Sequence, residues 1–461
     1  MTGPTPLAPP APRFAAWLER WGPLLPLLVA EFIVWVGFGG LLPIMPLYFT
    51  QHGVDLGSLG IVIAAWPAAR LVGEPIFGWI ADRSARVPLM VVGLVVTGIA
   101  LGLPLVFTGP LEFLLLRALA GFATAIYDPA ARGYLTDATP PERRGEAFGL
   151  YGAAQMGGLL LGPAIGGVGA AVFGGVAFVF VFGALVTLLA AVAVAVRVRE
   201  SAQVGRRGRI APAYDITEFP TEPPIVYQRA ADDAFAEAAE GDAARRGDAA
   251  RPGDAALPSA PASLWNRRLI AAIFINLGGY FAGGTYEVIW SVFLLSKGAG
   301  LDLIGLTFAM FALPVLIVSP LAGRLIDRRG SFAFVVVGSV MMATPSFIYP
   351  LLGNPLHVIP FILVEGTGFA ILNPALYAIV AGASPRGRTS TAQGIFGAAG
   401  TLGTIVASVL AGYLAGVDLR YPFWVAATVM YILLVAGVIV GGGAIRRMSA
   451  PGGSFDPVPS A

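Results

Sequence analysis

Residues 78–86 read Gly-Trp-Ile-Ala-Asp-Arg-Ser-Ala-Arg, and residues 323–330 read Gly-Arg-Leu-Ile-Asp-Arg-Arg-Gly. In both stretches, at the end of a long apolar run, a glycine precedes an Asp-Arg pair at the same spacing. The two glycines are 245 residues apart (323 minus 78), and the same offset relates other residues along the chain. These pairs are Gly53 and Gly298, Gly60 and Gly305, Pro75 and Pro320, Pro129 and Pro374, and Arg143 and Arg388. A register without gaps over this length predicts two halves with the same fold.

The composition is that of an integral membrane protein. Of the 461 residues, 56% are apolar and 12% are charged, whereas about 25% of an average soluble domain is charged. A membrane span with its loop takes roughly 30 residues, so about twelve spans are expected. Apolar runs bounded by charge, Gly or Pro place these spans at 23–49, 57–81, 87–107, 111–136, 147–172, 175–196, 269–295, 302–326, 333–352, 357–381, 391–415 and 421–444.

Charge in the loops predicts the orientation and the domain boundaries. Arginines gather in alternate loops, and such loops lie in the cytoplasm because Lys and Arg resist translocation. Both termini are therefore expected in the cytoplasm. Residues 199–264 change abruptly to Ala, Asp, Glu, Arg and Pro, which favours a disordered cytoplasmic linker, with a short surface or partner-binding helix at 227–239 as the alternative. The predicted domains are a tail (1–22), a six-helix bundle (23–198), the linker (199–264), a second six-helix bundle (265–446) and a tail (447–461).

Missing residue types argue against several classes of protein. The chain has no Cys and two His, His52 and His357, so a metal centre or a cysteine nucleophile is not expected. There is no Gly-rich phosphate loop with a lysine, which argues against ATP as the energy source. Basic residues are scattered along the chain rather than gathered on one face, which argues against nucleic acid as a partner. We therefore expect neither an enzyme nor a cofactor.

Four motifs carry a resemblance to a known family. The two stretches quoted first are similar to motif A of the major facilitator superfamily, although Ala85 stands where a glycine is usual. Residues 158–167, Gly-Leu-Leu-Leu-Gly-Pro-Ala-Ile-Gly-Gly, resemble motif C, the signature of its antiporters, and residues 117–121, Arg-Ala-Leu-Ala-Gly, resemble motif B. Residues 37–46, Gly-Phe-Gly-Gly-Leu-Leu-Pro-Ile-Met-Pro, are similar to the first-span motif of twelve-span drug:proton antiporters. The implied gating residues are Gly78, Asp82, Arg83, Arg86, Gly323, Asp327 and Arg328, and the motif C residues are Gly158, Gly162, Pro163, Gly166 and Gly167.

Each motif also has an ordinary structural interpretation. Motif A could be positive charge after a span, the motif B arginine could belong to a structural ion pair, and motif C could serve small-residue packing. The span-five pattern of motif C does not recur in the second half, where Ala407, Ser408 and Ala411 stand in its place. This difference favours a specific role for motif C over general richness in glycine.

The resemblance implies an all-α integral membrane protein with about twelve transmembrane helices in two pseudo-symmetric six-helix bundles. It further implies a secondary active transporter of the cell membrane, with proton-coupled efflux of amphipathic small molecules or drugs by alternating access. The expected partners are a small-molecule substrate, protons and the lipid bilayer, and we expect a monomer. The alternative is uptake, or lipid or metabolite transport, on the same fold. A non-transporting receptor or a membrane enzyme is a more distant alternative.

Ionisable residues within spans are the candidates for coupling, because a charge inside a membrane is costly. Arg70 with Glu74, and Asp128 with Arg132, are spaced to form ion pairs one helical turn apart. Glu31 has no basic residue at that spacing. It is therefore the leading candidate for the proton carrier, with a polar helix contact as the alternative. The predicted proton-coupling residues, in order of preference, are Glu31, Asp128 and, as a modulator, Arg117.

Two further acids and several aromatic residues are candidates for the substrate cavity. Glu287 and Glu365 also lack a basic residue one turn away, and either could recognise a cation from the second half. Aromatic rings at similar depths suit an amphipathic or planar compound, although packing against helices or lipid is the alternative. The predicted cavity residues are Glu287, Glu365, Trp35, Tyr127, Tyr286, Trp290 and Tyr377.

Overall fold

The structure is a computed structural model, which describes Trp17 and residues 20–140, 143–173, 175–200, 263–385 and 388–448. All of these except Ser263 belong to one compact unit, and a second unit comprises residues 205–263. The predicted linker, residues 199–264, therefore lies outside the described residues except at its two ends. Most of the two predicted tails lie outside them as well, so the domain boundaries stay predictions.

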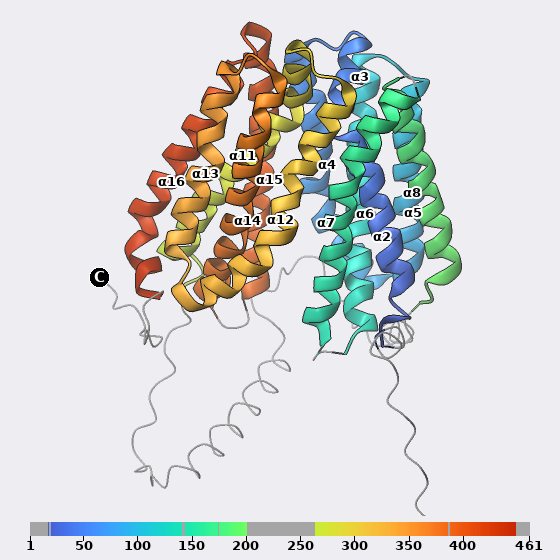
Figure 1. Cartoon of the computed structure of the whole chain (residues 1–461). Helices are drawn as coiled ribbons and strands as arrows, with labels where there is room; N and C mark the ends of the chain where they lie inside the picture. Colours follow the sequence, from blue (N-terminus) through green and yellow to red (C-terminus); the bar gives the residue numbers. More distant parts are fainter. Residues whose placement is uncertain are drawn as a thin grey trace, which may run out of the picture. The chain divides into compact units, whose positions relative to one another are not determined.

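Within these ranges the chain forms helices and no β-strand. Eleven helices are long and apolar enough to cross a membrane, and a bent pair makes a twelfth span. This confirms the expected all-α fold, whose helices Figure 1 shows running side by side. The first half contains α2 (Leu25–Leu41), α3 (Met45–Gln51), α4 (Leu56–Arg83), α5 (Arg86–Gly102), α6 (Pro110–Ala138), α7 (Arg144–Val172) and α8 (Phe178–Arg197). The second half contains α11 (Arg267–Ser296), α12 (Leu301–Arg329), α13 (Phe332–Ile348), α14 (Val358–Ala383), α15 (Thr389–Val417) and α16 (Tyr421–Met448).

The first span differs from the continuous run expected at 23–49. It is broken into α2 and α3, which meet at an angle of 44°. Pro43 lies in the break, and Pro46 lies in the first turn of α3. Proline has no N–H to donate and is well tolerated in the first turn of a helix, whereas in a helix interior it bends or breaks the chain. The two prolines therefore account for the bend.

Polar side chains fix the starts of two long helices. Asp55 caps α4 by accepting hydrogen bonds from the Ser58 backbone N–H at 3.0 Å and from the Ser58 hydroxyl at 2.6 Å. These hydrogen bonds lower the pKa of the Asp55 carboxyl, which lies in the loop before the span. Asn266 caps α11 in the same way, by accepting from the Leu269 N–H at 3.1 Å. Each cap satisfies a backbone donor that the helix itself leaves unpaired.

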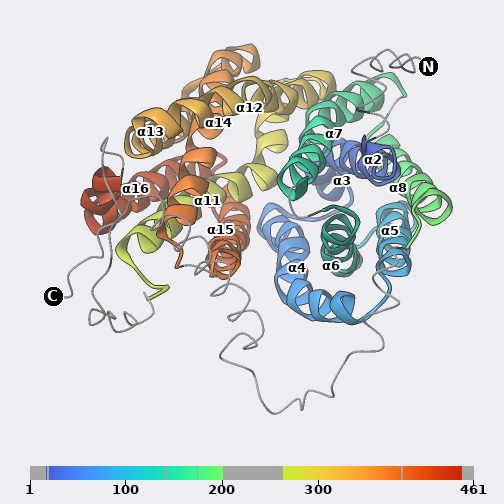
Figure 2. The ribbon, with the colours of Figure 1, turned by 90° about the horizontal axis from the view of Figure 1, so that it is seen from below.

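Glycines bring the two halves into close contact. Figure 2 shows α7 beside α12 and α4 beside α15. Gly167 and Gly305 lie at the first crossing, and Gly60 and Gly412 lie at the second. A Cβ built on Gly305 would lie 2.3 Å from a backbone carbonyl oxygen of α7, and one built on Gly60 would lie 2.2 Å from a backbone carbonyl oxygen of α15. A larger residue at either position would force the helices apart.

Both crossings lie at one end of the unit, where α4 and α12 begin and α7 and α15 end; we call it the glycine end. A single apolar cluster there joins residues of both halves, including Phe49 and Phe113 of the first and Phe293 and Phe423 of the second. The opposite end, which we call the arginine end, carries the two motif A stretches. The halves are therefore packed together at the glycine end.

Replacing Gly305 by alanine is expected to open the crossing of α7 and α12, because the new Cβ would meet backbone atoms. The chain has no Cys, so nitroxide labels can be attached to cysteines introduced at Ala171 and Asp302, which are exposed at the ends of these helices. Double electron–electron resonance should show a longer and broader distance distribution in Gly305→Ala than in the labelled parent.

The matched control is Gly416→Ala on α15, at the same end, where a Cβ would meet nothing within 4 Å. This control is expected to leave the distances unchanged. An unchanged distribution in Gly305→Ala would show that the glycine contact does not hold the two helices together.

Candidate functional site

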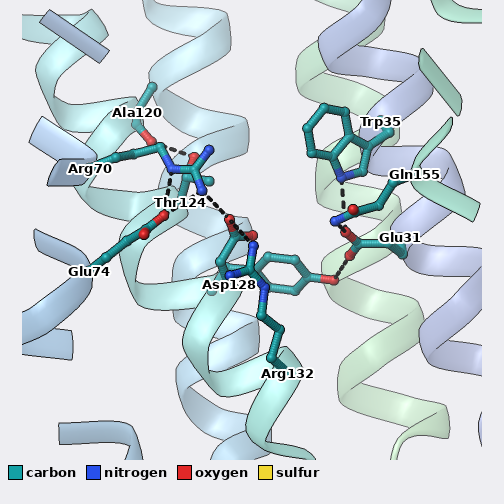
Figure 3. A network of polar contacts seen from close by, with 10 residues as sticks. Glu31, Trp35, Arg70, Glu74, Ala120, Thr124, Asp128, Arg132 and Gln155 are labelled. Carbon is teal, nitrogen blue, oxygen red and sulfur yellow. Dashed lines mark hydrogen bonds and ion pairs between the residues drawn. The ribbon is translucent and has the colours of Figure 1, made fainter. Parts of the chain in front are cut away.

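Glu31 on α2 is fully buried within the first half. Its carboxylate accepts hydrogen bonds from three uncharged donors: Trp35 Nε1 at 2.9 Å, Gln155 Nε2 at 2.6 Å and the Tyr127 hydroxyl. Trp35 lies one turn further along α2, Tyr127 is on α6 and Gln155 is on α7, and Figure 3 shows Trp35 and Gln155 directed at the carboxylate. None of the ion pairs formed between described residues includes Glu31. Its charged form is thus held by hydrogen bonds from neutral groups.

A charged network lies next to this site (Figure 3). Asp128 on α6 is 3% exposed, and its Oδ2 lies 2.6 Å from Arg70 Nη2 of α4 and 3.8 Å from Arg132 Nη2. Arg70 Nε also donates to Glu74 at 3.0 Å. The two pairs expected to neutralise themselves separately therefore share one network, in which the contact between helices is shorter than the pair within α6. Spacing along one helix could not show this, because it does not say which residue of the next helix lies opposite.

Arg117 and Glu287 form an ion pair between the two halves. Arg117 Nη2 on α6 lies 3.1 Å from Glu287 Oε1 on α11, and it also donates to the Ile63 carbonyl at 3.2 Å. Arg117 is 7% exposed, and its guanidinium carbon lies 5.7 Å from the centre of the Trp66 ring. One residue expected to modulate the proton site and one expected to bind substrate are thus partners of each other.

The other predicted residues of the second half lie in or near an aromatic cluster. Glu365 is 3% exposed and accepts a hydrogen bond from the Tyr349 hydroxyl at 2.6 Å. The rings of Trp290 and Tyr286 are centred 4.8 and 6.3 Å from the Tyr349 ring. Tyr377 lies apart from them and is 45% exposed. The cluster is closely packed, with Glu365 as its buried acid.

A cavity of about 60 Å³ lies inside the first half, between α2, α5, α6 and α8, and is lined mostly by apolar groups. Trp35 and Tyr127 line it, as do Arg117 and Asp128. The lining comes entirely from the first half, so the predicted cavity residues of the second half are not part of it: Glu287, Glu365, Tyr286, Trp290 and Tyr377. The structure therefore does not bring the seven predicted residues into one cavity.

The first motif A loop is attached to two other helices. Arg86 is 4% exposed; its Nη2 lies 3.1 Å from Asp82, and its Nε lies 3.4 Å from Asp137 at the end of α6. The backbone N–H groups of Arg86 and Val87 donate to the two carboxylate oxygens of Glu200 at 3.1 and 2.9 Å. Glu200 follows α8, so a side chain beyond the sixth span caps the start of α5.

The other motif A residues have open surroundings. The Asp82 side chain is 71% exposed, and the Arg83 guanidinium lies over the Trp79 ring at 4.2 Å. A Cβ on Gly78 would meet its nearest neighbour at 3.9 Å, and one on Gly323 would meet nothing within 4 Å. Arg328 is exposed, and the Asp327 side chain lies outside the described residues. The motif A glycines are thus uncrowded, in contrast to those of the glycine end.

The sequence profile of the Major Facilitator Superfamily matches residues 27–302 and 272–451, which together span most of the chain. The chain belongs to the Major Facilitator Superfamily. It is a transporter and not an enzyme, as the sequence motifs indicated. In the part of this transporter that the structure describes, no group of three or more His, Asp or Glu side chains is placed to hold a metal ion.

Related proteins agree with this assignment. The transporter is 23% identical over 411 residues to Multidrug resistance protein 2 of Bacillus subtilis (strain 168), covering 88% of its own chain and 92% of that protein. It is 27% identical over 136 residues to Quinolone resistance protein NorA of Staphylococcus aureus (strain MRSA252), covering 30% and 35% of the two chains. Two solved structures share the fold at 14% identity and a TM-score of 0.69: the nucleoside transporter NupG, with 90% and 99% of the two chains covered, and an inward-facing bacterial homologue of the lysosomal transporter Spinster, with 94% and 99% covered.

Motif C of the transporter joins α7 to two other helices. A Cβ on Gly158, Gly162 or Gly166 would lie 2.5, 2.5 or 2.3 Å from backbone oxygens of α2, the helix that carries Glu31. A Cβ on Gly167 would instead lie 2.6 Å from a backbone oxygen of α12 in the second half. The motif is thus a close-packing face whose last glycine turns to the other half.

Three residues of this arrangement were missed by the sequence analysis. Gln155 is a polar amide within a span, and the cost of burying polar groups could have singled it out in the same way as the acids. Asp137 and Glu200 stand at the ends of spans, where acids are common, so the sequence offers no signal for their contacts with Arg86. Their role depends on which loops lie side by side in space.

Glu200→Ala in the transporter is expected to loosen the first turn of α5, because two backbone donors lose their acceptor. A cap is worth about 1 kcal/mol, which corresponds to roughly fivefold faster local amide exchange. Hydrogen–deuterium exchange of a peptide covering residues 84–90 measures this. The matched control is Glu146→Ala, an exposed glutamate in the first turn of α7. Equal protection of the peptide in both variants would contradict the capping role.

Removing both partners of the Arg117–Glu287 pair is expected to cost less than the sum of the two single changes. A lone buried charge is destabilising, whereas loss of the whole pair leaves none. Unfolding of Arg117→Gln, Glu287→Gln and the double variant in mixed micelles should give a coupling of about 0.5–3 kcal/mol. The exposed Asp418–Arg420 pair, 2.8 Å apart in a loop, is the control and should give a smaller coupling. Additive effects at the first pair would show that it is not formed.

Proposed function

We propose that this transporter exports amphipathic small molecules, including drugs, in exchange for protons, with both termini in the cytoplasm. The observation that carries the proposal is Glu31, which is fully buried and held by neutral hydrogen-bond donors. A carboxyl group in such a setting can gain or lose a proton without stranding a buried cation. It is therefore suited to carry protons across the membrane.

The comparison with Asp128 explains why Glu31 is preferred. Asp128 lies against Arg70 and Arg132, so protonating it would remove a counter-charge from two guanidinium groups. An ion-paired carboxylate is expected to keep its charge and to serve as structure. Asp128 remains the second candidate for the proton carrier because Tyr127, the residue before it, links the network to Glu31.

Alternating access is supported by the position of the contacts between the halves. Backbone contacts at the glycine end close α4 on α15 and α7 on α12, while the motif A glycines at the arginine end are uncrowded. Under the predicted orientation, the closed end faces outward. In the other half of the cycle the glycine contacts separate, the Arg117–Glu287 pair opens, and Glu31 exchanges its proton with the outside.

The substrate class is supported by the relatives and by the aromatic lining near Glu31. The relatives at 23% and 27% identity are named for multidrug and quinolone resistance. Trp35 and Tyr127 belong to the proton site and also line the apolar cavity. A molecule bound there would contact two of the three groups that hold the Glu31 carboxylate, which gives substrate and proton a shared point of contact.

Glu31→Gln is expected to abolish proton-coupled transport while leaving the fold intact, because glutamine is similar in size but cannot exchange a proton. Purified protein is reconstituted into liposomes that contain a trapped pH dye. A panel of lipophilic cations and neutral antibiotics is then added. Proton movement should accompany transport by the wild type and fall to the level of empty liposomes in Glu31→Gln.

The matched control is Glu112→Gln, an exposed acid in the first turn of α6, which should transport like the wild type. Full proton-coupled transport by Glu31→Gln would overturn the assignment of the carrier. Silence of the folded wild type across the whole panel would overturn drug export in favour of lipid or metabolite transport.

A further inference from the structure

The cavity inside the first half contains polar groups that the mechanism above does not use. Its lining includes Thr187 on α8 and Arg117 on α6. In the described part of the chain, the Thr187 hydroxyl and the Arg117 Nε are buried and have no hydrogen-bond partner. Thr187 is 1% exposed and Arg117 is 7% exposed. Two unpaired groups on facing walls of one cavity are unusual, because buried polar atoms are nearly always hydrogen-bonded.

The chemistry of these two groups defines what they can bind. The Arg117 Nε–H can only donate a hydrogen bond, and the Thr187 hydroxyl can donate or accept one. The complementary group is therefore an oxygen acceptor, such as a ketone, ester or amide carbonyl. The Arg117 Nη2 is already bonded to Glu287 and to a backbone carbonyl, so its orientation is fixed, with Nε left available.

The size and the walls of the cavity define the rest of the occupant. A volume of about 60 Å³ is well below the roughly 300–1,000 Å³ of pockets that enclose a whole drug-sized ligand. The walls include the rings of Phe38, Phe49, Phe113 and Phe180. Phe49 and Phe113 are stacked 4.4 Å apart towards the glycine end, where the apolar cluster described above closes the bundle. The cavity thus suits a small apolar group carrying one oxygen, not an entire molecule.

We propose that this cavity is a specificity subsite of the transporter, which takes a short apolar group bearing a carbonyl-type oxygen from the exported molecule. The inference rests on the proposed export function and adds the chemical class that the first half selects. The oxygen is held by the Thr187 hydroxyl and the Arg117 Nε–H, and the apolar part lies among the phenylalanine rings. Substrates that lack the oxygen bind less tightly because both polar groups stay unpaired.

The test uses two probes of the same shape, 2-heptanone and 2-methyl-1-heptene, which differ in having a carbonyl oxygen or a methylene group. Binding to purified full-length protein in detergent is measured from the rise in the unfolding midpoint with probe concentration. The ketone is expected to bind about five- to tenfold more tightly than the alkene, the range for hydrogen bonding of one oxygen.

Thr187→Val keeps the shape of the side chain and removes the hydroxyl. It should weaken binding of the ketone severalfold and leave the alkene unchanged. The matched control is Thr401→Val on α15, whose hydroxyl is exposed and bonds to its own helix; it should leave both probes unchanged. Ala100→Leu, which adds bulk to the cavity lining on α5, should abolish binding of both probes. If Ala100→Leu does not fold, the Thr187→Val result decides alone.

Equal affinity of the wild type for both probes, or a ketone preference that survives in Thr187→Val, would overturn the proposal. Lack of binding by either probe to folded wild type would do so as well, and would leave the cavity to water. Because these measurements need no transport, they separate the subsite from the export function. Failure of proton coupling in Glu31→Gln would leave the probe result standing, and the reverse also holds.

Discussion

A charge buried among membrane-spanning helices has to find its partners within the protein, and this requirement arranges the first half of the transporter around α6. Four side chains of that helix reach four different neighbours. Arg117 pairs with α11, Tyr127 donates to Glu31 of α2, Asp128 pairs with Arg70 of α4, and Asp137 binds Arg86 at the start of α5. These positions lie about ten residues apart, or roughly 15 Å along a helix. One helix thus connects the contact between halves, the proton site and the motif A loop.

This arrangement offers a physical route for coupling. Rocking of one half against the other has to break the contact between Arg117 and Glu287, because it is a direct bond between the halves. Arg117 and Tyr127 are on the same rigid helix, and both line the cavity beside Glu31. A change at the cavity is therefore felt at the proton site and at the contact between halves without any long chain of intermediates. The contact is local and two-state, which is what a coupling mechanism needs.

The sequence predicted the features that depend on composition and periodicity. Span number, the repeat and the buried position of Glu31 follow from apolar runs and from the cost of charge in a membrane, and the structure agrees with them. The partners of the buried groups could not be predicted in the same way. Arg70 lies opposite Asp128, and Glu200 opposite the start of α5, because of how helices rotate and cross, which no local pattern records. The bend after Leu41 was within reach, since Pro43 and Pro46 were already noted.

The repeat explains why the scaffold is symmetric while the chemistry is not. Gly60 and Gly305 are repeat mates, and so are the glycines that they contact on α15 and α7, so the two crossings between halves are copies of one contact. The buried charges do not follow this rule: the offset that relates the glycines places Asn276 opposite Glu31. Asn276 is 4% exposed and donates to a backbone carbonyl of α15 at 2.9 Å, a helix contact that needs no charge. An amide and a carboxylate fill equivalent sites with similar hydrogen bonding, but only the carboxylate can exchange a proton near neutral pH. Symmetric packing therefore lets the halves move as equals, and the substitution of one residue type confines proton chemistry to the first half.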